Sequence, residues 1–152
     1  MNHVMVLTLL VLQGFVVAFI LLHDWVPLGR FNNLQGVREV DPLGKRIAVT
    51  LLSALPFALT LWFSWEYAAA PRFPMWVRMW LWATYGLSVL AAARAWWIPY
   101  LGPGDPEVTA RYQVRFADTH AFLPERNGMA PDTLHVALHT VLLAILVMVA
   151  VL

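Results

Sequence analysis

Four of the five histidines in this 152-residue sequence are spaced so that their side chains could meet in one place. His135 and His139 are four residues apart, which in an α-helix puts both on one face with their Cβ atoms about 5–6 Å apart. His120 precedes them in a loop, and His23 follows the first apolar run. Zinc and iron both accept imidazole nitrogen as a ligand. The four histidines therefore predict a divalent metal site, either zinc or iron.

Acidic residues close to these histidines offer oxygen ligands that would complete a metal shell. They are Asp24, Asp118, Glu125 and Asp132. The helical motif H-V-A-L-H has Val136 where zinc proteases carry the glutamate that serves as general base, so that protease class is excluded. Haem held by two histidines is less favoured, because it needs ligands on facing helices at similar depth and only His23 comes near this. A histidine cluster that binds no metal remains the alternative.

Arginines near the same histidines predict a second kind of contact. Arg94, Arg111 and Arg115 lie in or next to the segment that precedes His120. A guanidinium binds phosphate and carboxylate groups with two parallel hydrogen bonds. We expect these three side chains to hold the anionic head group of a substrate.

The elements that position these side chains follow from composition. The chain is 61% hydrophobic and 12% charged, with a mean hydropathy of +0.66, whereas an ordinary soluble domain is about 25% charged. Four apolar runs, at residues 4–22, 47–65, 75–98 and 133–152, have the roughly 20 residues that a helix needs to cross a bilayer. The sequence predicts an all-α integral membrane protein, with residues 1–152 forming a single bundle of four transmembrane helices.

A short helix is also expected in the connection between the third and fourth apolar runs. Asp105 and Pro106 are typical of a helix start, as N-cap and first residue. If the helix continues, Val108, Tyr112, Phe116 and His120 share one face, which predicts an amphipathic interfacial helix that ends at a histidine. His139 would lie roughly 10 Å inside the last helix. We expect it to face the bundle interior, because imidazole is costly against lipid.

Basic residues predict the orientation in the membrane. Eight of the ten Lys and Arg residues lie in or beside the two long connections: Arg30, Arg38, Lys45, Arg46, Arg94, Arg111, Arg115 and Arg126. The short connection has only Arg72 and Arg78. The positive-inside rule then puts the long connections in the cytoplasm and both termini outside, in a bacterial inner membrane. Trp96 and Trp97 are expected to anchor the cytoplasmic boundary.

Three classes of function are compatible with the sequence. The first is a metal-binding membrane enzyme that acts on a lipid or quinone-like substrate, with activity that depends on His139. The second is a non-catalytic accessory subunit of a larger membrane complex, and the third is a small transporter. Membrane lipids, a second copy of the chain or a larger complex are the expected partners, and no nucleic acid is expected. The chain has no cysteine, which excludes disulfides and thiolate metal sites.

Overall fold

The computed structural model describes residues 2–103 and 105–151, and their regular structure is entirely helical. Three helices are long and apolar enough to cross a membrane: α1 (His3–Leu22), α3 (Leu43–Glu66) and α7 (Thr133–Val151). A fourth long helix begins as α4 (Met75–Ala92) and continues through a π-helical turn, η2 (Ala93–Trp97), into α5 (Ile98–Leu101). The connections contain the short helices η1 (Gly29–Phe31), α2 (Leu34–Val40) and α6 (Pro106–Arg115).

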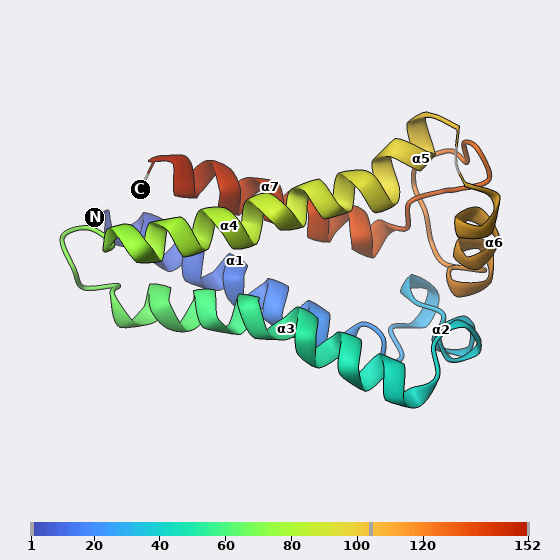
Figure 1. Ribbon diagram of the computed structural model, residues 1–152, viewed down its shortest axis with the longest axis horizontal. Coiled ribbons are helices and arrows are strands. Elements are labelled where there is room, and N and C mark those ends of the chain that lie inside the picture. Colours follow the sequence, from blue (N-terminus) through green and yellow to red (C-terminus); the bar gives the residue numbers. More distant parts are fainter. Residues whose placement is uncertain (1, 104, 152) are drawn as a thin grey trace.

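The four long helices lie side by side (Figure 1). Helix α1 packs against α3 and α7, and α4 packs against α3 and α7. The N- and C-terminal parts of the chain and the α3–α4 connection lie at one end of the bundle, which we call the opposite end. At the other end, α2 packs on α6 across the start of α3 and the end of α4. We call this the histidine end; it comprises residues 19–50, 92–103 and 105–139.

Helix boundaries agree with the predicted runs to within a few residues. Helix α3 begins at Leu43, four residues before the predicted apolar run. Its first turn contains Lys45 and Arg46, which are compatible with a helix but do not belong to an apolar run. The predicted helix in the last connection begins at its expected N-cap, where the Asp105 carboxylate accepts a hydrogen bond from the Glu107 amide at 2.8 Å. It ends at Arg115, however, and Asp118 adopts a left-handed φ of 58°. The prediction that His120 shares a helix face with Tyr112 is therefore wrong.

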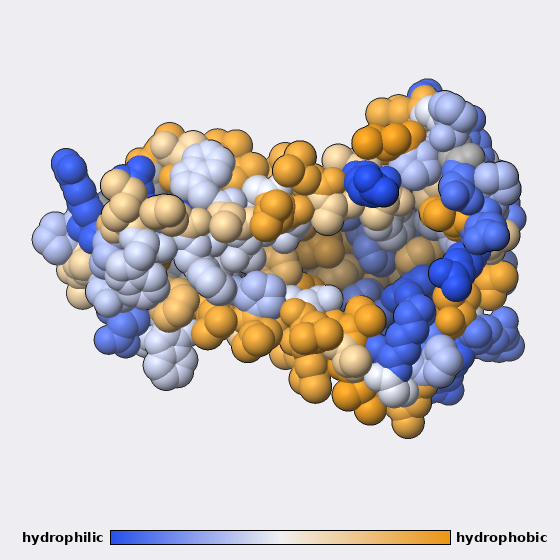
Figure 2. Space-filling view, in the orientation of Figure 1, coloured by the Kyte–Doolittle hydropathy of each residue, from blue (hydrophilic) through white to orange (hydrophobic). Residues whose placement is uncertain are grey.

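Bulky apolar side chains point away from the bundle on all four long helices. Val11, Leu52, Leu87 and Val147 are all more than 60% exposed. Figure 2 shows such residues as large orange areas along the helices. An apolar surface of this extent is unfavourable in water and favourable against lipid. The exposed surface therefore agrees with the apolarity of α1, α3 and α7 in indicating a membrane environment.

Polar contacts inside the bundle tie α1, α3 and α4 together. The Gln13 amide donates to the Ser64 hydroxyl at 3.1 Å, and the hydroxyl oxygens of Thr60 and Tyr85 are 3.2 Å apart. All four side chains are fully buried. Buried hydrogen bonds of this kind stabilise helix–helix packing where apolar contacts alone would allow helices to slide. They fix the relative positions of the helices that carry the histidine end.

Candidate functional site

Asp132 positions His135 at the start of α7. One carboxylate oxygen of Asp132 accepts hydrogen bonds from the amides of Leu134 and His135, at 3.0 and 3.1 Å, as a helix cap does. The other oxygen lies 2.7 Å from Nδ1 of His135. Asp132 is only 1% exposed, so this arrangement is held by the surrounding protein. Asp132 therefore caps α7 and holds His135 at the same time, and Nε2 of His135 is left as the nitrogen available for chemistry.

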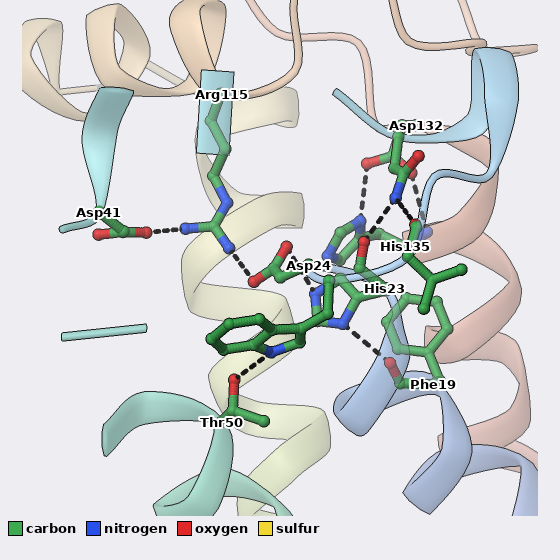
Figure 3. A network of polar contacts seen from close by, with 11 residues as sticks. Phe19, His23, Asp24, Asp41, Thr50, Arg115, Asp132 and His135 are labelled. Carbon is green, nitrogen blue, oxygen red and sulfur yellow. Dashed lines mark hydrogen bonds and ion pairs between the residues drawn. The ribbon is translucent and has the colours of Figure 1, made fainter. Parts of the chain in front are cut away.

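His23 lies directly against His135. The two ring centroids are 5.6 Å apart, with the His135 ring edge-on to that of His23, and Phe19 stacks on the His23 ring at 4.5 Å. Nδ1 of His23 is 2.9 Å from the Phe19 carbonyl oxygen, and Nε2 is 3.3 Å from a carboxylate oxygen of Asp24. Burial lowers the pKa of His23; the nearby Asp24 charge opposes this shift, and His135 and Arg115 add to it. The site thus holds two adjacent imidazoles, each next to a carboxylate (Figure 3).

Arg115 connects three segments of the chain through two carboxylates. Its guanidinium, at the end of α6, lies 2.6 Å from an oxygen of Asp24 and also binds Asp41, which separates α2 from α3. Lys45 binds the second oxygen of Asp41 at 2.6 Å. Burial acts to raise the pKa of Asp41, but its contacts with Lys45 and Arg115 outweigh this, so the pKa is lowered. Figure 3 shows the guanidinium between Asp41 and Asp24.

Aromatic side chains enclose the imidazoles. Trp96, on the π-helical turn η2, stacks on His135 with the ring centroids 4.3 Å apart and the planes 23° apart. Phe116 packs edge-on against His135 at 5.2 Å. The sequence assigned Trp96 only to boundary anchoring, but the structure makes it one wall of the site. These rings exclude water from one side of His135 and strengthen its electrostatic contact with Asp132.

A cavity of ≈420 Å³ opens beside His135. Its polar lining comprises Asp41, Lys45, Arg111, Tyr112, Arg115 and His135. Val49 on α3 and Ala95 on η2 line its apolar side. Figure 2 shows a hollow between the two long arms of the molecule, with hydrophilic side chains at the histidine end and hydrophobic ones along the helices. The cavity therefore offers polar and apolar surfaces to the same ligand.

The remaining two histidines of the predicted cluster lie in different surroundings. His139 is buried one helical turn beyond His135, as expected, and the two ring centroids are 6.2 Å apart. His120 instead bonds Thr133 through Nδ1 at 2.7 Å and packs against Phe31. Among residues 2–103 and 105–151, no three histidine, aspartate or glutamate side chains are arranged to hold a metal ion. A zinc or iron shell shared by all four histidines stays a prediction.

The other residues predicted from the sequence are divided between the site and the surface. Arg115 and Asp24 lie in the site but bind each other. Arg111 is exposed and lines the cavity. Arg94 and Asp118 are both exposed, and neither lines this cavity. The sequence analysis missed Asp41, although Lys45 four residues later was a signal for an ion pair at the start of a helix.

The chain shows no detectable similarity to proteins of known family, function or structure. No protein-family model matches it, and no curated protein or solved structure matches it either. No residue of the site therefore acquires a role from a relative, and its chemistry is inferred from geometry.

Proposed function

We propose that this protein is an integral membrane enzyme that performs acid–base chemistry on the polar head of an amphiphile at one membrane boundary. The observation that carries the proposal is the Asp132–His135 pair. His135 lines the cavity together with Arg115 and packs against His23. A histidine held by a carboxylate is a common general base, because the carboxylate fixes the tautomer and stabilises the imidazolium that forms. Such a pair at a membrane boundary favours catalysis over simple packing.

The proposal includes four membrane crossings. Helix α4 packs against α3 and α7, and Met79, Leu87 and Leu90 on its outer face are each about two-thirds exposed. With η2 and α5 it forms a helix from residue 75 to residue 101. An even number of crossings agrees with the start of α1 and the end of α7 lying at one end of the bundle (Figure 1). The basic residues then favour a cytoplasmic histidine end in a bacterial inner membrane.

The two arginines that line the cavity have different roles, because only one of them is paired with carboxylates. Arg115 and Lys45 are neutralised by Asp24 and Asp41, so Arg115 acts as a positioning residue that holds Asp24 next to His23. Within the described residues, no ion pair joins Arg111 to a carboxylate. Arg111 is therefore the side chain to bind an anionic head group, while His135 accepts or donates the proton. The apolar part of the amphiphile would lie along Val49 and Ala95.

Conversion of a membrane lipid tests the proposal directly. The purified protein is reconstituted into vesicles of total bacterial lipid extract, and the lipids are compared by mass spectrometry before and after incubation. We expect one species to be converted by the natural chain and by His3→Ala, because His3 is an exposed histidine at the opposite end. Substitution His135→Ala should slow the conversion by about 10²–10⁴-fold, the usual contribution of a general base. No conversion by the natural chain would refute the enzyme and favour the accessory subunit.

A metal-assisted form of the same enzyme depends on whether the residues fit a metal ion. Nδ1 of His135 is occupied by Asp132 and Nδ1 of His23 by the Phe19 carbonyl, so each ring has only Nε2 left for a metal ion. Nε2 of His23 also lies 3.3 Å from an oxygen of Asp24. Two imidazole nitrogens fall short of the three protein ligands that catalytic zinc usually has. Elemental analysis of the purified protein tests whether the site binds a metal ion. Stoichiometric zinc or iron that disappears in His23→Ala and His135→Ala would establish the metal-assisted form.

A further inference from the structure

A second cavity, of ≈270 Å³, lies between α4 and α7 and is almost entirely apolar. Its walls include Val89, Ala92, Ala93, Trp97, His139 and Leu142. Leu143 also lines it and is 50% exposed, so the cavity reaches the lipid-facing surface of the bundle. This cavity shares no lining residue with the one beside His135. It can therefore be occupied and tested separately.

His139 lines this cavity and carries an unpaired polar atom. The residue is 6% exposed, and its buried Nδ1 has no hydrogen-bond partner among the described residues. Three other rings surround the His139 ring. The distances from its centroid to those of Trp96, Trp97 and His135 are 5.8, 6.1 and 6.2 Å. A buried polar atom left without a partner costs about 1–3 kcal/mol. A ligand that supplies one hydrogen-bonding group to His139 would remove this cost.

We propose that this cavity binds the ring of a quinone-type molecule, with a ring carbonyl paired to the His139 imidazole. The lining has no charged side chain, which disfavours a phospholipid head group. The volume lies just below the 300–1,000 Å³ typical of pockets for drug-sized ligands, so it suits a single ring system. Trp97 offers a flat aromatic wall, and a hydrocarbon tail can leave past Leu143 into the bilayer. An imidazole N–H donates to a carbonyl oxygen, and that carbonyl is the one polar contact the cavity requires.

The π-helical turn creates the space for this ring. The widened turn at Ala93–Trp97 interrupts the regular helix at the point where it faces His139. Such turns are frequent at functional sites. Ala92 and Ala93 present only methyl groups to the cavity, so no side chain fills the gap that the turn leaves. A larger residue at position 93 should close the cavity without affecting any residue that lines the one beside His135.

Quinone binding to the intact protein in lipid nanodiscs tests the proposal. A short-tail benzoquinone is titrated into loaded and empty nanodiscs, and the bound amount is measured after separation from free quinone. We expect saturable binding of one quinone per chain above the partition into empty nanodiscs. His139→Leu should weaken it at least tenfold, which equals about 1.4 kcal/mol and lies within the cost of an unpaired partner. Ala93→Leu should weaken it as much by filling the cavity from the other wall.

Matched variants separate this site from the acid–base site. His3→Leu and Arg111→Ala should bind quinone as the natural chain does, because neither residue lines the cavity. Arg111→Ala should retain quinone binding while it weakens lipid conversion, so the two proposals can fail independently. Quinone uptake equal to that of empty nanodiscs, or unchanged affinity in both His139→Leu and Ala93→Leu, would overturn the proposal. If His139→Leu does not fold, the Ala93→Leu result decides alone.

Discussion

The histidine end and the opposite end of the bundle are built from different interactions. At the opposite end, α3 and α4 pack through aromatic rings, with Phe63 and Trp76 edge-on at 4.9 Å and Tyr67 and Trp76 at 5.7 Å. At the histidine end, α3 and the π-helical turn η2 that follows α4 line a cavity, and α2 packs on α6. Within residues 2–103 and 105–151, every ion pair lies at the histidine end.

This difference predicts which end of the bundle is more sensitive to substitution. Aromatic packing tolerates substitution by residues of similar size, whereas a network of buried charges requires each partner in place. Changes at the histidine end should therefore have large effects, and matched changes at the opposite end should have small ones. Each variant below is measured by SDS-induced unfolding in micelles.

The largest effect is expected from Arg115→Ala. The substitution leaves the carboxylates of Asp24 and Asp41 without their shared guanidinium, and uncompensated buried charge is strongly destabilising. We expect the free energy of unfolding to fall by about 3 kcal/mol. The matched control is Arg72→Ala in the exposed α3–α4 connection, which should change it by less than about 0.5 kcal/mol. If both variants lower the free energy of unfolding equally, the ion pairs of the histidine end do not make that end more sensitive to substitution.

A slightly smaller effect is expected from Gly36→Ala. An added Cβ at Gly36 would lie 2.2 Å from the Val114 carbonyl oxygen, so α2 and α6 would have to separate. We expect a loss of about 2 kcal/mol, within the usual range for overpacking. Gly86→Ala on α4, outside the histidine end, is the control, since nothing lies within 4 Å of its added Cβ. A stable Gly36→Ala protein would show that close packing of α2 on α6 does not hold the histidine end together.

Asp132→Ala should have a moderate effect, because the residue both caps α7 and binds His135. Loss of an N-cap costs about 1 kcal/mol and up to about 2 kcal/mol. Asp132→Asn retains an oxygen that can accept from the α7 amides but loses the negative charge next to His135. We expect near-natural stability for Asp132→Asn together with reduced lipid conversion. If Asp132→Asn converts lipid at the natural rate, the carboxylate does not assist His135.

The smallest effect is a pH dependence due to His23. Its folded-state pKa is lowered from the usual 6.5 by burial, so the unfolded chain binds more protons between the two values. The stability that His23 contributes is therefore fully present above about pH 6.5 and is lost as the pH falls towards the folded-state pKa. His23→Gln should show a smaller loss of stability than the natural chain when the pH is lowered from about 7 to about 5. His3→Gln should follow the natural chain, since His3 is exposed.

Much of the architecture was predictable because it depends on local properties of the chain. Each long helix follows from an apolar run of sufficient length, and the starts of α6 and α7 follow from the capping residues Asp105 and Asp132. The end of α6 was not predictable in the same way. Its last turn stops at Arg115, where the side chain binds Asp24, which follows α1, and Asp41 at the α2–α3 junction. A pattern within α6 contains no information about those distant partners.

The sequence by itself determined the helical class, the apolar exterior and the pairing of His135 with His139 on one face of α7, because each depends on hydropathy or on helical periodicity. Only the tertiary structure decided which partners the polar side chains have. It packed the His23 ring against that of His135 and paired Arg115 with two carboxylates, those of Asp24 and Asp41. It also brought His120 within hydrogen-bond distance of Thr133. Asp24 and Arg115 are 91 residues apart in the chain. Contacts over such separations depend on how the helices pack, because a charge is buried at low cost only where that packing brings a partner to it.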